Sequence, residues 1–74
     1  MRVSVDSQWV KTGDPESPVM VRNVRTRGGM IVGRVTRSSK ETRFGAMEFK
    51  MGQWREIAHD YPTFEDAVMA LERL

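Results

Sequence analysis

Basic side chains gather in one segment of this sequence, and they are the residues with the clearest potential for chemistry. Between Pro18 and Gly45 the only acid is Glu41, and the basic residues are Arg22, Arg25, Arg27, Arg34, Arg37, Lys40 and Arg43. The segments before and after this one each carry a net negative charge. A regional positive charge attracts a polyanion or an acidic protein surface. The first expectation is therefore a binding surface for an acidic partner.

Residues that support catalysis or bind metal ions are scarce. The chain has no cysteine and a single histidine, His59. Common enzymatic reactions need a nucleophile with a positioned base, a pair of carboxylates in a cleft, or a metal ion. We therefore expect a protein that is not an enzyme. It should have no catalytic residue, cofactor or metal ion, and no small-molecule substrate.

Length and hydropathy set the class of protein. A chain of 74 residues predicts a single domain over residues 1–74, which buries only about 60% of the surface of its unfolded chain. No apolar run approaches the ~20 residues needed to span a bilayer, and the alternating start is unlike a signal peptide. We expect a cytoplasmic protein with no membrane partner. Small stand-alone proteins of this kind are common in phages and mobile elements, which is the origin we expect.

The first half of the chain predicts one strand, one loop and one hairpin. Polar and apolar residues alternate over 1–10, with Val3 and Val5 on one side, and Trp9 is left open between core and interface. The turn-forming residues of 11–18 predict the longest loop. Strands over 19–26 and 30–37 flank Gly28 and Gly29, which predict a tight type I′ turn.

This hairpin fixes a predicted register and two faces. With Gly28 and Gly29 as the turn, Val24 lies opposite Gly33, and Thr26 lies opposite Ile31. The core face then holds Met20, Val24, Ile31 and Val35. The face open to solvent holds Asn23, Arg25, Arg34 and Thr36.

The second half predicts another hairpin and a helix. After a polar loop over 38–42, a strand over 44–50 and the turn Met51-Gly52 place Phe49 opposite Trp54 on the core face, with Met47 also in the core. Glu48 then lies opposite Arg55 on the outer face. Thr63 is a helix N-cap candidate with Asp66 three residues on. An apolar stripe follows on one helix face: Phe64, Ala67, Val68, Leu71 and Leu74.

Together these elements predict an α+β fold. The expected architecture is an antiparallel sheet of four or five strands, a meander of hairpins, with one C-terminal α-helix packed on one face. The basic residues would then project from the opposite face.

The predicted partner is duplex nucleic acid or a nucleic-acid-handling host protein complex. Arg25, Arg34, Arg27, Lys40 and Arg43 would contact phosphates, while Asn23 and Thr36 would reach base edges. A sheet can enter a major groove. Because no aromatic motif of the RNP type interrupts the basic stretch, binding of a single strand by stacking is less favoured than binding of a duplex or a protein. The alternative is that these charges form a solvated face that only promotes solubility.

Two motifs carry a resemblance to known DNA-binding domains. The chain has Trp54-Arg55 in its last predicted strand and the run Tyr61-Pro62-Thr63-Phe64-Glu65-Asp66-Ala67 at the start of its helix. With the basic strands before them, these resemble the arm-type DNA-binding domains of phage and transposon integrases and the plant ethylene-response DNA-binding domain. The resemblance implies a sheet in the DNA major groove and a helix behind it. The extra N-terminal strand and the acid Glu48 depart from that pattern.

A rival hypothesis gives the same surface a protein target. In size and build the chain is also similar to small phage anti-CRISPR proteins. It would then be a phage-encoded inhibitor that docks on a host protein complex through its arginines. Charge by itself does not separate the two hypotheses, because both targets are acidic.

Overall fold

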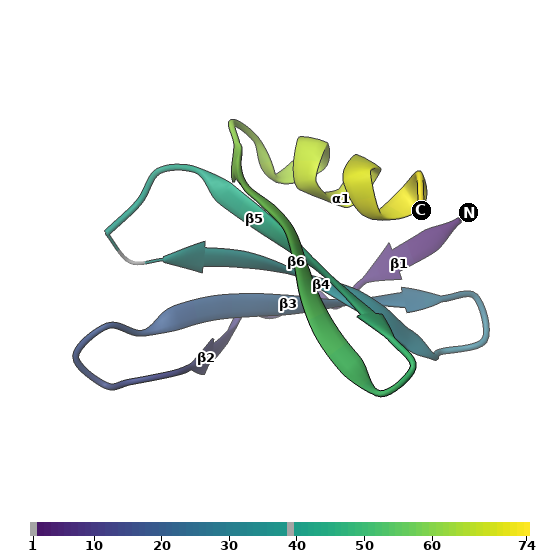
Figure 1. Ribbon diagram of the computed structural model, residues 1–74, viewed down its shortest axis with the longest axis horizontal. Helices are drawn as coiled ribbons and strands as arrows, with labels where there is room; N and C mark the ends of the chain where they lie inside the picture. The colour runs from purple at the N-terminus through teal and green to yellow at the C-terminus, as the bar shows by residue number, and fades with distance from the viewer. Residues whose placement is uncertain (1, 39) are drawn as a thin grey trace.

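The computed structural model describes residues 2–38 and 40–74, in which six strands form one antiparallel sheet and one helix lies on it (Figure 1). Met1 and Ser39, which belong to the predicted first strand and the predicted polar loop, lie outside the described residues. The elements are β1 (Val3–Val5), β2 (Val10–Thr12), β3 (Val19–Thr26), β4 (Ile31–Ser38), β5 (Phe44–Lys50), β6 (Gln53–Tyr61) and α1 (Phe64–Glu72).

The sheet confirms the predicted α+β class, with one more strand than expected. The strand order is β1-β3-β4-β5-β6, and β2 also pairs with β3. β1 pairs with the C-terminal end of β3, and β2 pairs with its N-terminal end. The predicted first strand therefore becomes two short strands that share one edge.

β2 shortens the loop that we predicted over 11–18. Lys11 pairs with Met20 and Thr12 pairs with Val19, so these two residues belong to the sheet. The Thr12 hydroxyl also donates a hydrogen bond to the Val19 carbonyl oxygen at 3.1 Å. That part of the loop prediction was wrong, because a strand that pairs at an edge needs no periodic pattern of its own.

The β3–β4 hairpin confirms the predicted register along most of its length but not at its turn. Val24 lies opposite Gly33, and Met20 lies opposite Arg37, as expected. The predicted type I′ turn is wrong, since Gly29 has a φ of 88° but Gly28 is not left-handed. The Gly29 amide donates to the Thr26 carbonyl at 2.9 Å, and the Thr26 amide donates to the Met30 carbonyl at 2.8 Å. This pattern is a three-residue loop whose last residue is a left-handed glycine.

The longer loop shifts the pairing next to it and changes the core. Arg25 lies opposite Ile31, with a bulge between Val24 and Arg25. As a result Val32, and not Ile31, packs against the buried cluster. The predicted core position of Ile31 was wrong because one extra residue moves the following side chains to the other face. Met20, also expected in the core, is only partly buried.

The two glycines of this loop should respond differently to alanine. Gly29→Ala should destabilise the protein by about 1 kcal/mol or more, because a left-handed residue with a Cβ atom is strained. Gly28→Ala should change stability by less than about 1 kcal/mol, and in the stabilising direction, because its conformation suits any residue. Urea unfolding of the two variants checks this. Equal losses of stability in both variants would instead support the type I′ turn that the sequence predicted.

The β5–β6 hairpin confirms the predicted pairs and reverses their faces. Phe49 lies opposite Trp54, and Glu48 lies opposite Arg55, around a two-residue turn. However, Glu48 is the buried residue, with 6% of its surface exposed, and it lies on the side of the sheet that faces α1. Phe49 and Trp54 lie on the opposite side, and so does Met47, whose neighbour on β4 is Arg34. The core positions predicted for Phe49, Trp54 and Met47 were therefore wrong.

Helix α1 begins as predicted and covers β4, β5 and β6. Thr63 is the N-cap, and its hydroxyl accepts a hydrogen bond from the Asp66 amide at 3.1 Å. Ala67 and Leu71 from the predicted stripe are fully buried, whereas Leu74 lies beyond the helix and is 56% exposed. The stripe thus ends one turn earlier than its spacing predicted.

The core is small, and α1 lies very close to the sheet above it. Its fully buried residues are Val24, Val35, Ala46, Ala67 and Leu71. A Cβ atom placed on Gly33 would lie 2.7 Å from the Leu71 Cδ2 atom and 2.5 Å from the Met47 carbonyl oxygen. Only a glycine therefore permits this approach of the helix to β4.

Gly33→Ala should destabilise the fold by about 1–3 kcal/mol, because the added methyl group overpacks the core. Its cost should be smaller in a Leu71→Ala background, where part of the clash is gone. Gly28→Ala is the matched control, since a Cβ atom there meets only the Thr26 hydroxyl, at 3.9 Å. Equal effects of Gly33→Ala in both backgrounds, measured by denaturant unfolding, would contradict the close helix contact.

Candidate functional site

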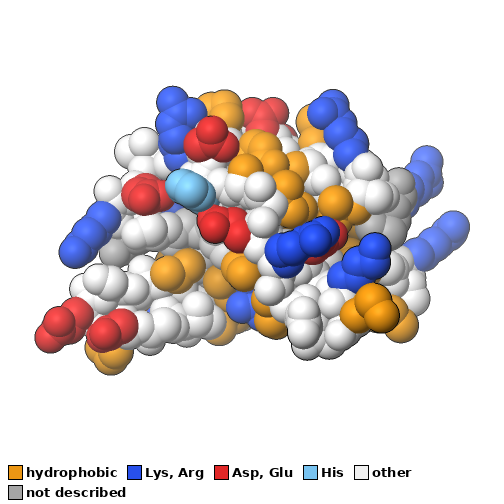
Figure 2. Space-filling view, viewed as in Figure 1, with side chains coloured by type: hydrophobic (Ala, Val, Ile, Leu, Met, Phe, Trp, Pro, Cys, Tyr) orange, Lys and Arg blue, Asp and Glu red, His pale blue; other side chains and the backbone are white. Residues whose placement is uncertain are grey.

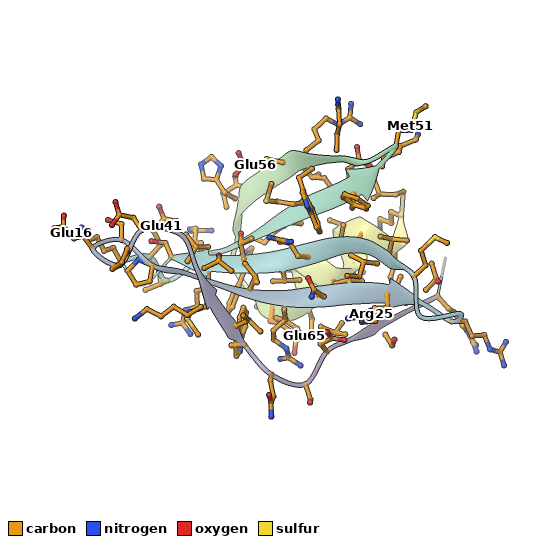
Figure 3. All side chains as sticks on the ribbon, turned by 90° about the horizontal axis from the view of Figure 1, so that it is seen from below. Glu16, Arg25, Glu41, Met51, Glu56 and Glu65 are labelled. Carbon is orange, nitrogen blue, oxygen red and sulfur yellow. The ribbon has the colours of Figure 1, made fainter. Side chains whose placement is uncertain are left out.

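The face of the sheet opposite α1, which we call the open face, brings together residues from four neighbouring strands (Figure 3). Alternate residues of a strand point to opposite faces, so the neighbours of Arg34 in the register define it. Its members near Arg34 are Asn23, Arg34, Thr36, Met47, Phe49, Trp54 and Glu56. Three of the predicted site residues, Asn23, Arg34 and Thr36, therefore do share a face.

A stack of an arginine and two aromatic rings is the centre of this face. The Arg34 guanidinium lies over the Trp54 ring, 3.7 Å from the ring centroid. The Phe49 ring lies beside Trp54, with 4.8 Å between centroids and 46° between planes. All three side chains are partly buried. We name Arg34, Phe49 and Trp54 the stacking platform.

Sequence reasoning missed the two rings of the platform because it assigned them to the core. One signal could have corrected this assignment: the small residues Gly33, Ala46 and Ala67 mark the side where a helix packs closely. Since Ala46 is three residues from Phe49, the two lie on opposite faces of a regular strand. Small residues thus identify the helix side better than large apolar ones do.

Two polar atoms at the platform have no hydrogen-bond partner. Among the described residues these are the buried Asn23 Oδ1 and Arg34 Nε atoms, and Asn23 lies directly opposite Arg34. Burial also lowers the pKa of Arg34, because it disfavours the charged form. Most buried polar groups in proteins are paired, so an unpaired acceptor and an unpaired donor on facing strands are unusual.

Arg25, another predicted contact, is already paired within the protein. Its Nε atom lies 2.9 Å from the Asp6 Oδ1 atom, and its NH1 group donates to the Gly29 carbonyl at 3.1 Å. The hydrogen bond from Arg25 holds the pKa of Asp6 below its usual value, and the same bond raises the pKa of Arg25. This arginine ties β1 to β3 and the hairpin loop.

The Asp6–Arg25 pair should contribute stability that depends on pH. A carboxyl group with a lowered pKa stabilises the folded state above its unfolded pKa of about 3.9, and this contribution is lost as the pH falls through the folded value. Asp6→Asn should therefore be less stable than wild type at pH 6, with a difference that shrinks towards pH 2 to 3. Arg25→Gln should lose the same pH-dependent contribution to stability. Thermal melts across this range check it, and a difference independent of pH would contradict the pair.

Two further arginines of the basic segment lie on the helix side. The Arg22 guanidinium lies 4.6 Å from the Phe64 ring centroid, and its Nε atom donates to the Asp6 carbonyl at 2.6 Å. Arg37 lies over the Phe44 ring at 5.6 Å. Because these cations pack on aromatic rings of the core rim, the basic segment of the sequence does not form one basic face.

The other predicted contacts lie at the two ends of the sheet. Arg27 is exposed at the β3–β4 loop. Lys40 and Arg43 are exposed in the β4–β5 loop at the opposite end, where Arg43 donates to the Asp60 carbonyl at 3.1 Å. Thr36 lies between these ends. The structure therefore separates the predicted phosphate contacts and does not gather them.

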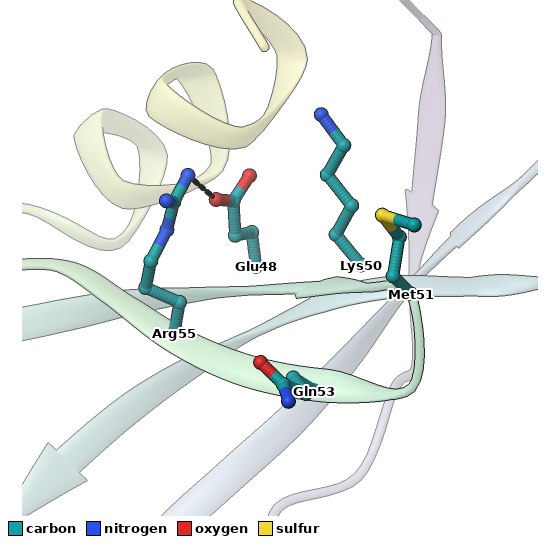
Figure 4. Close-up of a pocket in the computed structure, with 5 residues that line it drawn as sticks. All are labelled: Glu48, Lys50, Met51, Gln53 and Arg55. Atoms are coloured by element: carbon teal, nitrogen blue, oxygen red, sulfur yellow. Dashed lines mark hydrogen bonds and ion pairs between the residues drawn. The ribbon is translucent and has the colours of Figure 1, made fainter.

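Two of the shallow hollows on the molecule lie beside residues described above. One, of about 300 Å³, lies at the β5–β6 turn on the helix side, where Arg55 contacts the buried Glu48 carboxylate and Lys50 and Met51 stand alongside (Figure 4). The other, of about 340 Å³, lies at the far end of the open face, where His59 Nδ1 lies 3.1 Å from a Glu56 oxygen. In the part of the chain that the structure describes, no cluster of three ligand-type residues could hold a metal ion.

Within residues 2–38 and 40–74, no helix is both long and apolar enough to cross a membrane. Comparison with known proteins found no matching protein-family model, no matching curated protein and no matching solved structure. The site is therefore interpreted from its own geometry.

Proposed function

We propose that this protein is a non-enzymatic module that binds single-stranded nucleic acid on its open face. The observation that carries this proposal is the stacking platform: a guanidinium and two aromatic rings on the side of the sheet away from the helix. Unpaired bases stack on aromatic side chains and on arginine planes, and each such contact contributes about 1–3 kcal/mol.

The arrangement of charge favours a single strand over a duplex. A duplex binder needs a row of phosphate contacts, yet Arg25 is paired with Asp6, and Glu56 adds an acid to the open face. Exposed cations remain at the ends of the strands, with Arg27 at one end and Lys40 at the other. A single strand that crosses the platform could meet these cations with its backbone.

The unpartnered atoms give this face a means of contacting bases. Asn23 Oδ1 accepts hydrogen bonds and Arg34 Nε donates them, and neither atom has a partner in the protein. The edge of an unpaired base carries both donors and acceptors. Both atoms are covered by neighbouring side chains, so a base would reach them only where those side chains move aside.

Substitutions in the platform should separate stacking from charge. Trp54→Ala should weaken binding of a fluorescent single-stranded oligonucleotide by about 1–3 kcal/mol, whereas Trp54→Phe, which keeps a ring, should lose less. Arg34→Lys, which keeps the charge but not the plane, should fall between wild type and Trp54→Ala. Fluorescence anisotropy at two salt concentrations, with circular dichroism to confirm folding, measures these effects.

Several results would contradict the proposal. Wild-type protein that binds neither single-stranded DNA nor single-stranded RNA at low salt would contradict it. Folded Trp54→Ala protein with unchanged affinity for the oligonucleotide would also contradict it. Tighter binding to a duplex than to a single strand, insensitive to Trp54, would instead support the groove-binding arrangement that the resemblance implies.

The composition of the platform supports a second candidate. Trp and Arg are the residue types most enriched in protein-binding hot spots, and Phe and Met are also enriched at interfaces. This favours a protein partner, as in the rival hypothesis of an inhibitor that docks on a host protein complex. A host protein captured after nuclease treatment by wild type, and lost with Trp54→Ala, would support this candidate.

A further inference from the structure

Two hairpin turns at one end of the molecule carry the most exposed large apolar side chains of the described residues. Met51 in the β5–β6 turn is 93% exposed, and Met30 beside the β3–β4 loop is 72% exposed. Both turns lie at the end of the molecule where α1 also ends (Figure 1). A Cβ atom on Gly29 or on Gly52 would meet no described atom within 4 Å, so both turns project clear of the rest of the protein.

Met51 also has a backbone conformation that does not suit a methionine. Its φ is 54°, in the left-handed region that favours glycine or asparagine. A methionine at this position adds backbone strain and buries almost none of its side chain within the protein. An outlier of this kind points to a contact outside the chain.

The same end of the molecule carries a surplus of positive charge. Neither of the turn segments 25–34 and 49–55 contains an acid. Two acids towards this end are paired with arginines, Asp6 with Arg25 and Glu48 with Arg55, and a third, Glu72, lies in the last turn of α1. The exposed cations beside them are Arg2, Arg27, Lys50 and Arg73. In Figure 2, Lys and Arg side chains gather towards the right of the view, and apolar side chains lie at its lower right.

A bilayer that contains anionic lipids fits this combination of features. Its headgroups attract Lys and Arg side chains, and the boundary between headgroups and acyl chains accepts apolar side chains. A protein partner would need two separate pockets, placed to match two turns that come from different hairpins. A lipid surface needs no matching shape, because its molecules rearrange around whatever enters it.

We propose that this end of the molecule binds the surface of membranes that contain anionic lipids. Met30 and Met51 would enter the boundary between headgroups and acyl chains, while the cations beside them contact the anionic headgroups. Two apolar side chains and a few cations give weak, reversible binding. The sequence predicted no membrane partner because it has no apolar run long enough to span a bilayer, and a surface contact needs no such run. The contact requires no nucleic acid and stands apart from the function proposed above.

Co-sedimentation of the purified protein with lipid vesicles tests this contact. Vesicles of phosphatidylcholine with about 30% phosphatidylserine should bind the protein at about 0.1 M ionic strength, and vesicles of phosphatidylcholine alone should bind it about tenfold more weakly. Lys50→Glu should weaken binding to the anionic vesicles about fivefold or more, because it replaces an attraction to the headgroups by a repulsion.

Lys11→Glu is the matched control for charge. Lys11 is exposed on β2 and lies opposite Met20, at the end of β3 away from the β3–β4 loop. The substitution changes the net charge of the protein by the same amount as Lys50→Glu does. Because its charge is farther than a Debye length from a membrane that contacts the turns, Lys11→Glu should bind within about twofold of wild type.

Substitutions of the methionines separate the contact from folding. Met51→Asn should weaken vesicle binding about fivefold while the thermal midpoint stays the same or rises, since asparagine suits the left-handed turn. Adding Met30→Ser should bring the loss to about twentyfold, because side chains on separate turns contribute independently. Met69→Gln, which removes a methionine that is 44% exposed on α1, is the matched control and should bind as wild type does.

Three results would overturn the proposal. The first is wild-type protein that does not bind the anionic vesicles at low ionic strength. The second is unchanged binding of folded Met51→Asn protein, and the third is an equal loss in Lys50→Glu and Lys11→Glu, which would reduce the effect to net charge. If vesicle binding is absent and Met51→Asn instead abolishes capture of a host protein, the two turns belong to a protein interface and not to a lipid one.

Discussion

The contact between Leu71 and Gly33 is the constraint on which the rest of this structure depends. A side chain at Gly33 would collide with Leu71, and the fully buried residues around this point include Ala46 and Ala67. A domain of this size can bury little surface, so it gains stability by bringing its single helix as close to the sheet as possible. That approach is open only to strands that present small side chains to the helix.

This close approach also decides where the large side chains lie. With Gly33 and Ala46 on the helix side, Arg34, Phe49 and Trp54 must project from the other face, because neighbours in a strand alternate. The stacking platform is thus a consequence of how the core is packed. Glu48 is brought to the helix side by the same alternation, and its contact with Arg55 compensates its burial there.

The arginines show that charge in the sequence and charge on the surface differ. Arg22 and Arg37 lie over aromatic rings at the rim of the core, Arg25 is bound to Asp6, and Arg34 lies on Trp54. A guanidinium can pack flat on a ring and still donate hydrogen bonds, so it serves as a structural residue as readily as a binding one. The basic segment consequently does not form one basic face, and its exposed cations are divided between the two ends of the sheet.

The sequence by itself determined what depends on neighbouring residues: the α+β class, the N-cap at Thr63, and the pairing of Phe49 with Trp54 and of Val24 with Gly33. Turn and cap chemistry act over a few residues, and they set the β5–β6 register and the helix start without reference to the rest of the chain. The pairing of Val24 with Gly33 agrees with the prediction because a bulge beside the longer β3–β4 loop restores the expected register. Only the tertiary structure decided which face of the sheet meets the helix, and therefore where the platform lies. Both faces carry apolar residues, so alternation alone was ambiguous. The fit between Leu71 and Gly33, two residues far apart in the sequence, resolved it.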